Sequence, residues 1–582
     1  MLKKEGFPPF FVGFYMKAVL SALLIVPPLL LFHFQPLPSY PTEFLSAGLL
    51  VIITTSVVVF RSEPIAFPKV GIAWILLGCI WLIVTFTSDA ALEVKERRLF
   101  FVWIIGCLAL LARSIFGRSR GGQERISFFA ICILLMAFLQ SVIGFLNHYG
   151  VLGAYVSWLN YAGSRFSGTV AQPNMAAFSL FLGIASSLYL YLANRISSSL
   201  FFGVFSALLY FSFITYSRSF YLYLVILLFF FGVYAFFNKE GVKYRWFSAF
   251  LVLVPVLVFS VAKPIDEKIS YFFNEYYGLE DKYDPSERLN QFSDSARLCE
   301  WSKSYDALVN NDFSLFGNGI GSYSIFSSEY TSEANLSCSL DKRWSHSHNI
   351  LINSVVEWGW LGFLAVALSW VFALIMILKA SRGKERFYGL SLFSAFFVYS
   401  LIEFPLWNIY LLVVFLIFLS LYSPVWMVRF PSRDVFKGLS ILFLALMMWV
   451  GGSSFNVYLK VSEIFNAESP SERQLRWLYL YGSDSMYGDV VTLTRYYKFL
   501  PEPHSYEEQL MEVNALLDVE AHPILLVRKG LLHFLNKDGD EFCRVYDLLE
   551  YQYPRFFAQL NSDLNSVKNI SAFRVSDTLP CG

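Results

Sequence analysis

Apolar runs of about 20 residues, the length at which a helix crosses a bilayer, recur along this chain and constrain its fold more than any other feature. Hydrophobic residues make up 56% of the 582 positions and charged residues only 15%. A soluble chain of this length needs more charge to cover its surface. We therefore predict an all-α, polytopic helical membrane protein.

The apolar runs predict about thirteen transmembrane helices, each bounded to within several residues. These spans lie at 10–31, 44–60, 70–87, 99–116, 126–146, 174–193, 200–216, 219–237, 246–263, 349–378, 386–403, 407–428 and 436–453.

Basic residues gather in alternate connections between the spans, as the positive-inside rule requires of cytoplasmic loops. They lie at Lys3 and Lys4 and in residues 61–69, 113–125, 195, 239–245, 379–386 and 429–437. The opposite connections at 32–43 and 404–406 hold no Lys or Arg, whereas 88–98 mixes basic and acidic residues. The N-terminus is thus predicted in the cytoplasm, and an odd number of spans places the C-terminus on the far side.

Four regions follow from this topology: spans in 1–263, a large extracytoplasmic loop in 264–348, spans in 349–453 and an extracytoplasmic tail in 454–582. Amphipathic stretches at Ser471–Tyr481, Tyr506–Leu517 and Glu541–Tyr551 predict a small α-helical domain in the tail. The loop holds Cys299 and Cys338, and the tail holds Cys543 and Cys581. Two pairs suit an oxidising compartment, although the sequence does not show that either is bonded.

The segment Trp344–Asn349 is a polar island with two histidines, His346 and His348, directly before an apolar run. Imidazole exchanges protons near neutral pH, so chemistry is expected here. Their i, i+2 spacing does not place both rings on one helical face, and no Cys, Asp or Glu cluster with ligand spacing lies beside them. We predict neither a metal site nor a cofactor.

Other polar residues fall at the outer ends of the spans. Arg218 lies in a short turn between two apolar runs, where it either extends to interfacial water or binds phosphate. Glu403 ends its span and could pair with an arginine or orient a histidine. The run Phe316–Gly321 lacks the strand and the Lys-Ser/Thr of a phosphate loop, so a tight turn is expected.

Several short motifs follow one another along the chain. They are Gly163-x-Arg165-x-x-Gly168 with Gln172-Pro-Asn174, Ser217-Arg-Ser219, Arg297 with Trp301 and Gly317-Asn-Gly-x-Gly321, Ser345-His-Ser-His-Asn349 with Val356-Glu-Trp-Gly359, and Glu403-Phe-Pro405. Together, from about residue 150 to 410, the chain resembles the O-antigen ligase (Wzy_C) superfamily. The Glu-x-Pro motif and the long tail resemble its PglL-type protein O-oligosaccharyltransferase branch.

The resemblance implies a Gram-negative inner-membrane enzyme, of GT-C-like type, that moves a glycan from undecaprenyl pyrophosphate to an acceptor hydroxyl. His348 is the expected base, and Arg218 and Arg297 are expected to hold the leaving pyrophosphate without a metal. Substrate-binding roles are expected for Arg165, Gln172, Asn174, His346, Asn349 and Glu403. The expected partners are the lipid-linked glycan, a pilin-like acceptor protein and membrane lipids, with no nucleic acid.

Two alternatives stay open. An O-antigen ligase or polymerase would use a lipid A–core or glycan acceptor with the same motifs. A transporter or lipid flippase would instead show charged residues within spans and broken helices near the midplane.

Overall fold

A computed structural model describes residues 9–60, 64–87, 93–116, 122–156, 165–237, 241–278, 296–310, 315–329, 344–428, 432–467, 470–481, 488–498, 505–519 and 522–568. Gly163, Cys338 and Cys581 lie outside these ranges, so the parts of our predictions that rest on them are not described.

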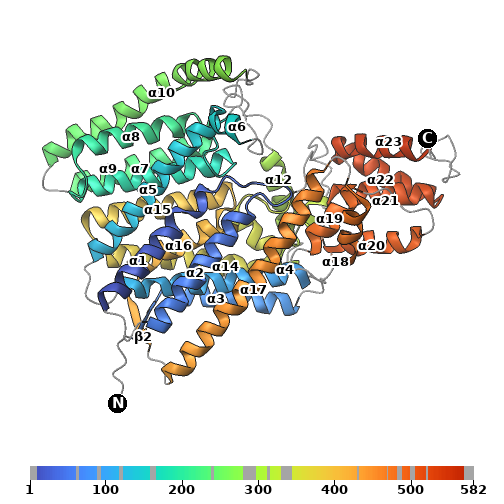
Figure 1. Ribbon diagram of the computed structural model, residues 1–582, viewed down its shortest axis with the longest axis horizontal. Helices are drawn as coiled ribbons and strands as arrows, with labels where there is room; N and C mark the ends of the chain where they lie inside the picture. Colours follow the sequence, from blue (N-terminus) through green and yellow to red (C-terminus); the bar gives the residue numbers. More distant parts are fainter. Residues whose placement is uncertain are drawn as a thin grey trace. The chain divides into compact units, whose positions relative to one another are not determined.

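The fold is almost entirely helical (Figure 1). The helices up to the large loop are α1 Pro9–Ile25, α2 Tyr40–Phe60, α3 Gly71–Thr87, α4 Glu93–Leu111, α5 Gly122–His148, α6 Val151–Tyr155, α7 Pro173–Leu192, α8 Ser198–Phe213, α9 Arg218–Phe237 and α10 Gly241–Tyr277. The loop contributes α12 Ala296–Val309 and α13 Tyr323–Glu329, and α14 Ile350–Ala380, α15 Gly383–Ile402, α16 Ile409–Tyr422 and α17 Arg433–Asn466 follow. The tail contains α18 Glu472–Tyr481, α19 Gly488–Lys498, α20 Tyr506–Val519, α21 Pro523–Leu535, α22 Gly539–Gln552 and α23 Pro554–Lys568. Short 3-10 turns occupy η1 Pro27–Leu29, η2 Ala112–Phe116 and η4 Pro405–Trp407.

The predicted spans fall on these helices and 3-10 turns, except that the last four residues of the span at 407–428 form a strand, Val425–Val428. Within the described residues, seven helices are long and apolar enough to cross a membrane, namely α2, α5, α7, α9, α10, α14 and α17. Shorter apolar helices lie at Gly13–Leu29, Gly71–Val84, Phe101–Phe116, Ser198–Phe213 and Ile409–Tyr422. The multi-pass, all-α character is thus confirmed, while the number of thirteen spans stays a prediction.

Two helices run well past the ends predicted from hydropathy. Helix α10 contains 37 residues and continues to Tyr277, although its apolar run stops near residue 263. Helix α17 contains 34 residues and continues to Asn466, past the predicted end at 453. At a rise of ~1.5 Å per residue, α10 is about 55 Å long, which exceeds the ~30 Å of a hydrocarbon core.

A two-stranded antiparallel sheet, absent from our prediction, joins β1 Ile65–Pro68 to β2 Val425–Val428. Ile65 pairs with Val428 and Pro68 with Val425. The hydroxyl of Ser114 bonds to both the amide and the carbonyl of Ala66. Connections that the charge pattern places in the cytoplasm therefore meet one another.

The chain forms two compact units, which we describe separately. Unit 1 comprises Met1–Ile75, Val102–Phe292 and Leu368–Ser453, and unit 2 comprises Leu76–Phe101, Ser293–Ala367 and Ser454–Gly582. The loop and the tail thus share one unit, whereas our sequence-based division treats them as separate regions. Our four domain boundaries remain predictions.

Helix α7 is the central helix of unit 1, and most of its length is buried. It packs against α5, α8, α9 and α15. Its buried face is rich in aromatic contacts; for example, the Phe178 ring lies 4.5 Å from Tyr399 and 4.8 Å from Phe396, between centroids. This packing fixes the ends of α7, and with them the polar loops described below.

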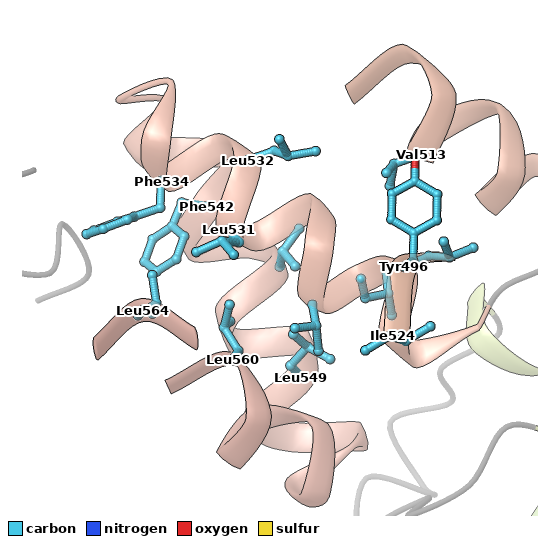
Figure 2. Packing of buried hydrophobic residues seen from close by; sticks show 14 of the residues in the cluster. Tyr496, Val513, Ile524, Leu531, Leu532, Phe534, Phe542, Leu549, Leu560 and Leu564 are labelled. Carbon is cyan, nitrogen blue, oxygen red and sulfur yellow. The ribbon is translucent and has the colours of Figure 1, made fainter. Parts of the chain in front are cut away.

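The tail folds around its own hydrophobic core in unit 2. Figure 2 shows side chains from α19 to α23, among them Tyr496, Val513, Leu531, Phe542 and Leu560, meeting between the helices. A buried ion pair crosses this core, with Arg528 Nη1 2.8 Å from Asp563 Oδ2. The predicted amphipathic stretches correspond to α18, α20 and α22, and α20 and α22 contribute apolar side chains to this core.

Candidate functional site

The predicted site residues fall into two groups, one in each unit. In unit 1, four polar side chains from separate loops form the Arg165–Glu403 network, which consists of Arg165, Asn174, Ser217 and Glu403. The Asn174 amide donates to Glu403 Oε1 at 2.8 Å, and Asn174 Oδ1 accepts from Ser217 Oγ at 2.9 Å. Arg165 Nη2 reaches the same Oδ1 at 3.5 Å. A single amide thus joins a cation to a carboxylate.

The backbone explains why these side chains meet. Pro173 occupies the first turn of α7, and the Gln172 side chain caps that helix by accepting from the Met175 amide at 2.5 Å. Asn174 is therefore held at the start of the buried central helix. Glu403 ends α15, where its backbone leaves the helical conformation.

The turn after α8 supplies the remaining contacts. Tyr216 has a φ of 48°, a conformation that non-glycine residues rarely adopt. Its carbonyl and that of Thr215 accept from the Arg165 guanidinium at 3.3 and 2.8 Å. The guanidinium thereby holds the turn in place, and Ser217 points to Asn174.

Two arginines bring positive charge to this region, against the single carboxylate of Glu403 in the network. Arg218 is exposed and begins α9, and Arg165 lies beside the start of α7. The first turns of α7 and α9 both face this end of unit 1, and helix N-termini carry partial positive charge. Two arginines and two helix N-termini thus lie at this end of unit 1.

Further loops reach the same end of unit 1. The His33 ring bonds to the carbonyls of Pro38 and Thr169 at 2.9 and 2.6 Å, and the Thr169 hydroxyl bonds to Pro28. The connections predicted to be extracytoplasmic thus meet one another at the network.

The second group is the histidine turn, Ser345–Asn349, in unit 2. His348 has a φ of 54°, in the left-handed region. The residue before it is held by two hydrogen bonds: Trp301 Nε1 donates to the Ser347 carbonyl at 2.8 Å, and the Ser347 amide donates to Asn353 Oδ1 at 3.1 Å. Asn349 Oδ1 accepts from the Leu351 and Ile352 amides and so caps α14. Backbone strain of this kind persists only where the surroundings enforce it.

The rings of the turn pack edge to face. The His348 ring lies 4.2 Å from the His346 ring and 5.0 Å from the Trp344 ring, between centroids. The His348 amide also donates to His346 Nδ1 at 3.3 Å. His346 therefore contacts both the backbone and the ring of His348.

The glycine run before the turn fills a break in α14. Gly359 has non-helical dihedrals, with φ 66° and ψ −166°. The Asn318 and Gly319 amides donate to the carbonyls of Val356 and Glu357, each at 3.0 Å, and the Leu361 amide donates to the Leu315 carbonyl at 3.2 Å. The run thus forms a turn whose backbone replaces hydrogen bonds that the broken helix has lost.

A buried charged cluster supports α12, which carries Arg297 and Trp301. Lys303 Nζ lies 3.1 Å from Glu300 Oε1, and the Tyr323 hydroxyl donates to Glu300 Oε2 at 3.2 Å. Glu300 is fully buried. Burial, and secondarily the Glu300 carboxylate, raise the pKa of Tyr323 well above its ordinary value. Arg297 is half-buried on the same helix.

Cys299 and Cys543 are each disulfide-bonded. Cys338 and Cys581, the partners expected from the sequence, lie outside the described residues, so the pairing stays a prediction. Cys79, Cys107 and Cys132 are free thiols in the apolar helices. Among the side chains that the structure describes, no group of three or more His, Cys, Asp or Glu could hold a metal ion.

The structure therefore brings Arg165, Asn174 and Glu403 together, and it brings His346 and His348 together. Gln172 and Asn349 act as helix caps, a role that the sequence signals through their positions before α7 and α14. Ser217 and Ser347 stand in motifs named above, but no role was predicted for them, and Asn353 was not identified from the sequence. Asn349 and Asn353 are one helical turn apart, and this spacing is the signal that could have suggested Asn353.

Fold and site together define a multi-pass, all-α membrane protein with a helical tail and two polar groups formed by its loops. Residues 203–367 match the Wzy_C family model, described as O-Antigen ligase. The matched segment contains Arg218, Arg297, His346 and His348, and it supports the superfamily rather than a branch of it. No curated protein and no solved structure matches the chain significantly. The match supports an enzyme that transfers glycans.

Proposed function

We propose that this protein transfers a glycan en bloc from undecaprenyl pyrophosphate to a Ser or Thr hydroxyl of a periplasmic protein such as a pilin. The observation that carries the proposal is the O-antigen ligase match over residues 203–367, because that segment holds the candidate base and two candidate phosphate ligands. Under this proposal the N-terminus is cytoplasmic, and the chemistry and the C-terminus are periplasmic, at a Gram-negative inner membrane.

The reaction needs a base and an anion site. The acceptor oxygen attacks the anomeric carbon, the bond from that carbon to the pyrophosphate oxygen breaks, and undecaprenyl pyrophosphate leaves with the bonding electrons. His348 takes the hydroxyl proton, since an alcohol is a poor nucleophile while it keeps it. Arg218 and Arg297 stabilise the charge that develops on the leaving group, which requires no metal.

The surroundings of His348 support the role of base. A base must be held within a fraction of an ångström of its working position to be effective. Here the neighbouring backbone is fixed by Trp301 and Asn353, and His346 lies against the ring. The exposed Arg218 and the Arg165–Glu403 network support binding of the lipid-linked donor in unit 1. Asn174 could there bind a hydroxyl of the sugar.

The tail supports a protein acceptor over a lipid acceptor. It has its own hydrophobic core and shares a unit with the loop that carries His348. A helical domain placed in this way can hold a folded partner while a surface loop of that partner enters the site. A lipid A–core or glycan acceptor remains the runner-up, and the identity of the glycosylated product separates the two.

One observation favours a transporter, since α14 is broken at Gly359 and broken helices mark binding sites in transporters. In transporters the exposed backbone groups at such breaks coordinate the cargo. Here the carbonyls of Val356 and Glu357 already accept from Asn318 and Gly319. The break is therefore filled by the chain itself, which favours the enzyme.

The test uses purified protein, undecaprenyl-pyrophosphate oligosaccharide and a pilin-type acceptor, with intact mass spectrometry of the acceptor. We expect a mass increase equal to one glycan, retained in EDTA. His348→Ala should abolish the increase, and Arg218→Ala should reduce it about 10²-fold or more, as loss of charge stabilisation does elsewhere. His346→Ala removes the other imidazole of the same turn, and its transfer activity is compared with that of His348→Ala. Full activity in both His348→Ala and Arg218→Ala would disprove the mechanism.

A further inference from the structure

Trp344 occupies the junction of two hydrophobic clusters in unit 2. It packs against the tail core, whose buried members are Tyr496, Val513, Ile524, Leu525, Leu526, Val527, Leu531, Leu532, Phe534, Phe542, Val545, Leu549, Tyr553, Leu560 and Leu564. It also packs against the loop core, which consists of Ala307, Tyr323, Phe326, Val355 and Val356. One side chain thus contacts the tail, the loop and the outer part of α14.

The same indole lies against the candidate base. Its ring centroid is 5.0 Å from that of His348, with the ring planes at 79°. His346 lies on the His348 ring as well, at 4.2 Å and 63°. Two aromatic contacts of this geometry restrict the rotation of an imidazole, because either one is lost when the ring turns.

Three of the hydrogen bonds of the turn fix the backbone on either side of His348. Trp301 holds the Ser347 carbonyl, Asn353 holds the Ser347 amide, and the Asn349 side chain caps α14. With the backbone fixed, the direction of the imidazole still depends on its side-chain torsions. Trp344 is therefore placed to select among orientations that the backbone leaves open.

The tail also lies close to α12, next to the residue that holds the turn. Tyr553 belongs to the buried tail core, and Glu300 precedes Trp301 on α12. Burial, and secondarily the charge of Glu300, raise the pKa of the Tyr553 phenol above its ordinary value. The tail core thus packs against Trp344, and its member Tyr553 lies near enough to Glu300 of α12 to sense its charge.

We propose that Trp344 is a positioning residue that sets the orientation of the His348 ring and is itself held in place by the tail core. The inference rests on the proposed function, in which His348 is the general base. It gives the tail a second role besides acceptor binding, since the tail core then forms part of the support of the catalytic histidine.

The experiment compares Trp344→Ala, Trp344→Phe and Trp477→Ala in the full chain. Trp477 is a half-buried tail tryptophan that lies under Lys460, so its removal measures the effect of losing any indole from this unit. Two quantities are measured: kcat and KM for transfer, and the rate at which diethyl pyrocarbonate modifies His348, followed by peptide mass spectrometry. The second measurement needs no substrate.

We expect Trp344→Ala to lower kcat about 10- to 100-fold with little change in KM, the usual result of misplacing a catalytic group. His348 should be modified several-fold faster than in the parent protein, an expectation based on the loss of one flanking ring. Trp344→Phe keeps an aromatic edge and should restore both quantities to within about threefold. Trp477→Ala should change neither.

Equal modification rates in the parent and Trp344→Ala would overturn the inference, as would equal losses of kcat in Trp344→Ala and Trp477→Ala. These results leave the proposed function intact if His348→Ala is inactive. Full activity in His348→Ala would instead refute the role of His348 as the base, whatever Trp344 does. If Trp344→Ala fails to fold, Trp344→Leu takes its place, because it keeps apolar bulk but removes the aromatic edge; an unchanged rate of His348 modification in that variant would overturn the inference.

Discussion

Replacing Gly317 by alanine tests whether the glycine loop fills the break in α14 as tightly as the structure indicates. Gly317 has a φ of 73°, which an L side chain rarely adopts. A Cβ at this position would land on the amide nitrogen of Gly359 and lie 2.6 Å from the carbonyl carbon of Glu357. Both contacts are with backbone, so no side chain can turn aside to relieve them.

The magnitude follows from these contacts. The left-handed conformation costs about 1–2 kcal/mol for a residue with a Cβ. If the clash moves the loop away, three backbone hydrogen bonds between 315–319 and 356–361 are lost, at about 1 kcal/mol each. The expected total is about 4–5 kcal/mol, of which about 3 kcal/mol is due to the loss of docking.

Gly278→Ala is the matched control. Gly278 also has a positive φ, of 64°, but no atom lies within 4 Å of an added Cβ. It therefore carries the conformational cost without the clash. The midpoints of thermal unfolding of the two variants, measured in the same detergent, should differ by roughly 6–12 °C. This follows from a shift of ~2–4 °C per kcal/mol for a cooperative unit of 150–250 residues. Similar midpoints for the two variants would show that the loop is not docked in the break, and the argument would fail.

Three further predictions concern the network, the loop and the tail. Asn174→Ala should lower the transfer rate about 10- to 100-fold by separating Arg165 from Glu403. The control Ser197→Ala removes the cap of α8 and should leave the transfer rate unchanged. Equal rates for the two variants in an acceptor mass assay would refute this role of Asn174. Burial raises the pKa of Tyr323, Tyr496 and Tyr553 in the folded protein. The folded state is therefore not destabilised by these phenols below pH 10, and above it each phenol lowers the free energy of unfolding by about 1.4 kcal/mol per pH unit. Tyr323→Phe should make the alkaline fall in unfolding temperature less steep. Arg528→Met leaves the Asp563 carboxylate buried without its ion pair and should destabilise the tail by about 3–5 kcal/mol, while adding Asp563→Leu should recover most of that loss.

The sequence predicted the membrane helices well because hydropathy follows directly from the cost of placing polar groups in lipid. It failed where helices leave the apolar region. Residues 264–277 and 454–466 are polar enough to end a hydropathy run, yet they continue α10 and α17 because their backbone hydrogen bonds simply extend the helix. The sheet between β1 and β2 was also missed, since its two strands are only four residues long and lie about 360 positions apart.

The order of the polar motifs led to a set of candidate site residues, but the partners of these residues depend on tertiary structure. Asn174 and Glu403 are 229 positions apart, and only the packing of α7 against α15 brings them together. Similarly, nothing local in the sequence signals that the loop amides of Asn318 and Gly319 bond to α14. Helix caps such as Gln172 and Asn349 could have been predicted, because position before a helix and residue type together define them.

The position of His348 at the start of α14 explains why so much of unit 2 surrounds one short turn. A helix that began at Asn349 and ran unbroken would project its first residue from the bundle, supported only by its own cap. Instead, α14 breaks at Gly359, and the loop bonds to the break and packs on Val355 and Val356. The nine residues between the turn and the break are thereby held by the loop, and the loop is held in turn by the buried Glu300–Lys303 pair. A base on such a segment is positioned before any substrate binds, which is the condition under which general base catalysis is most effective.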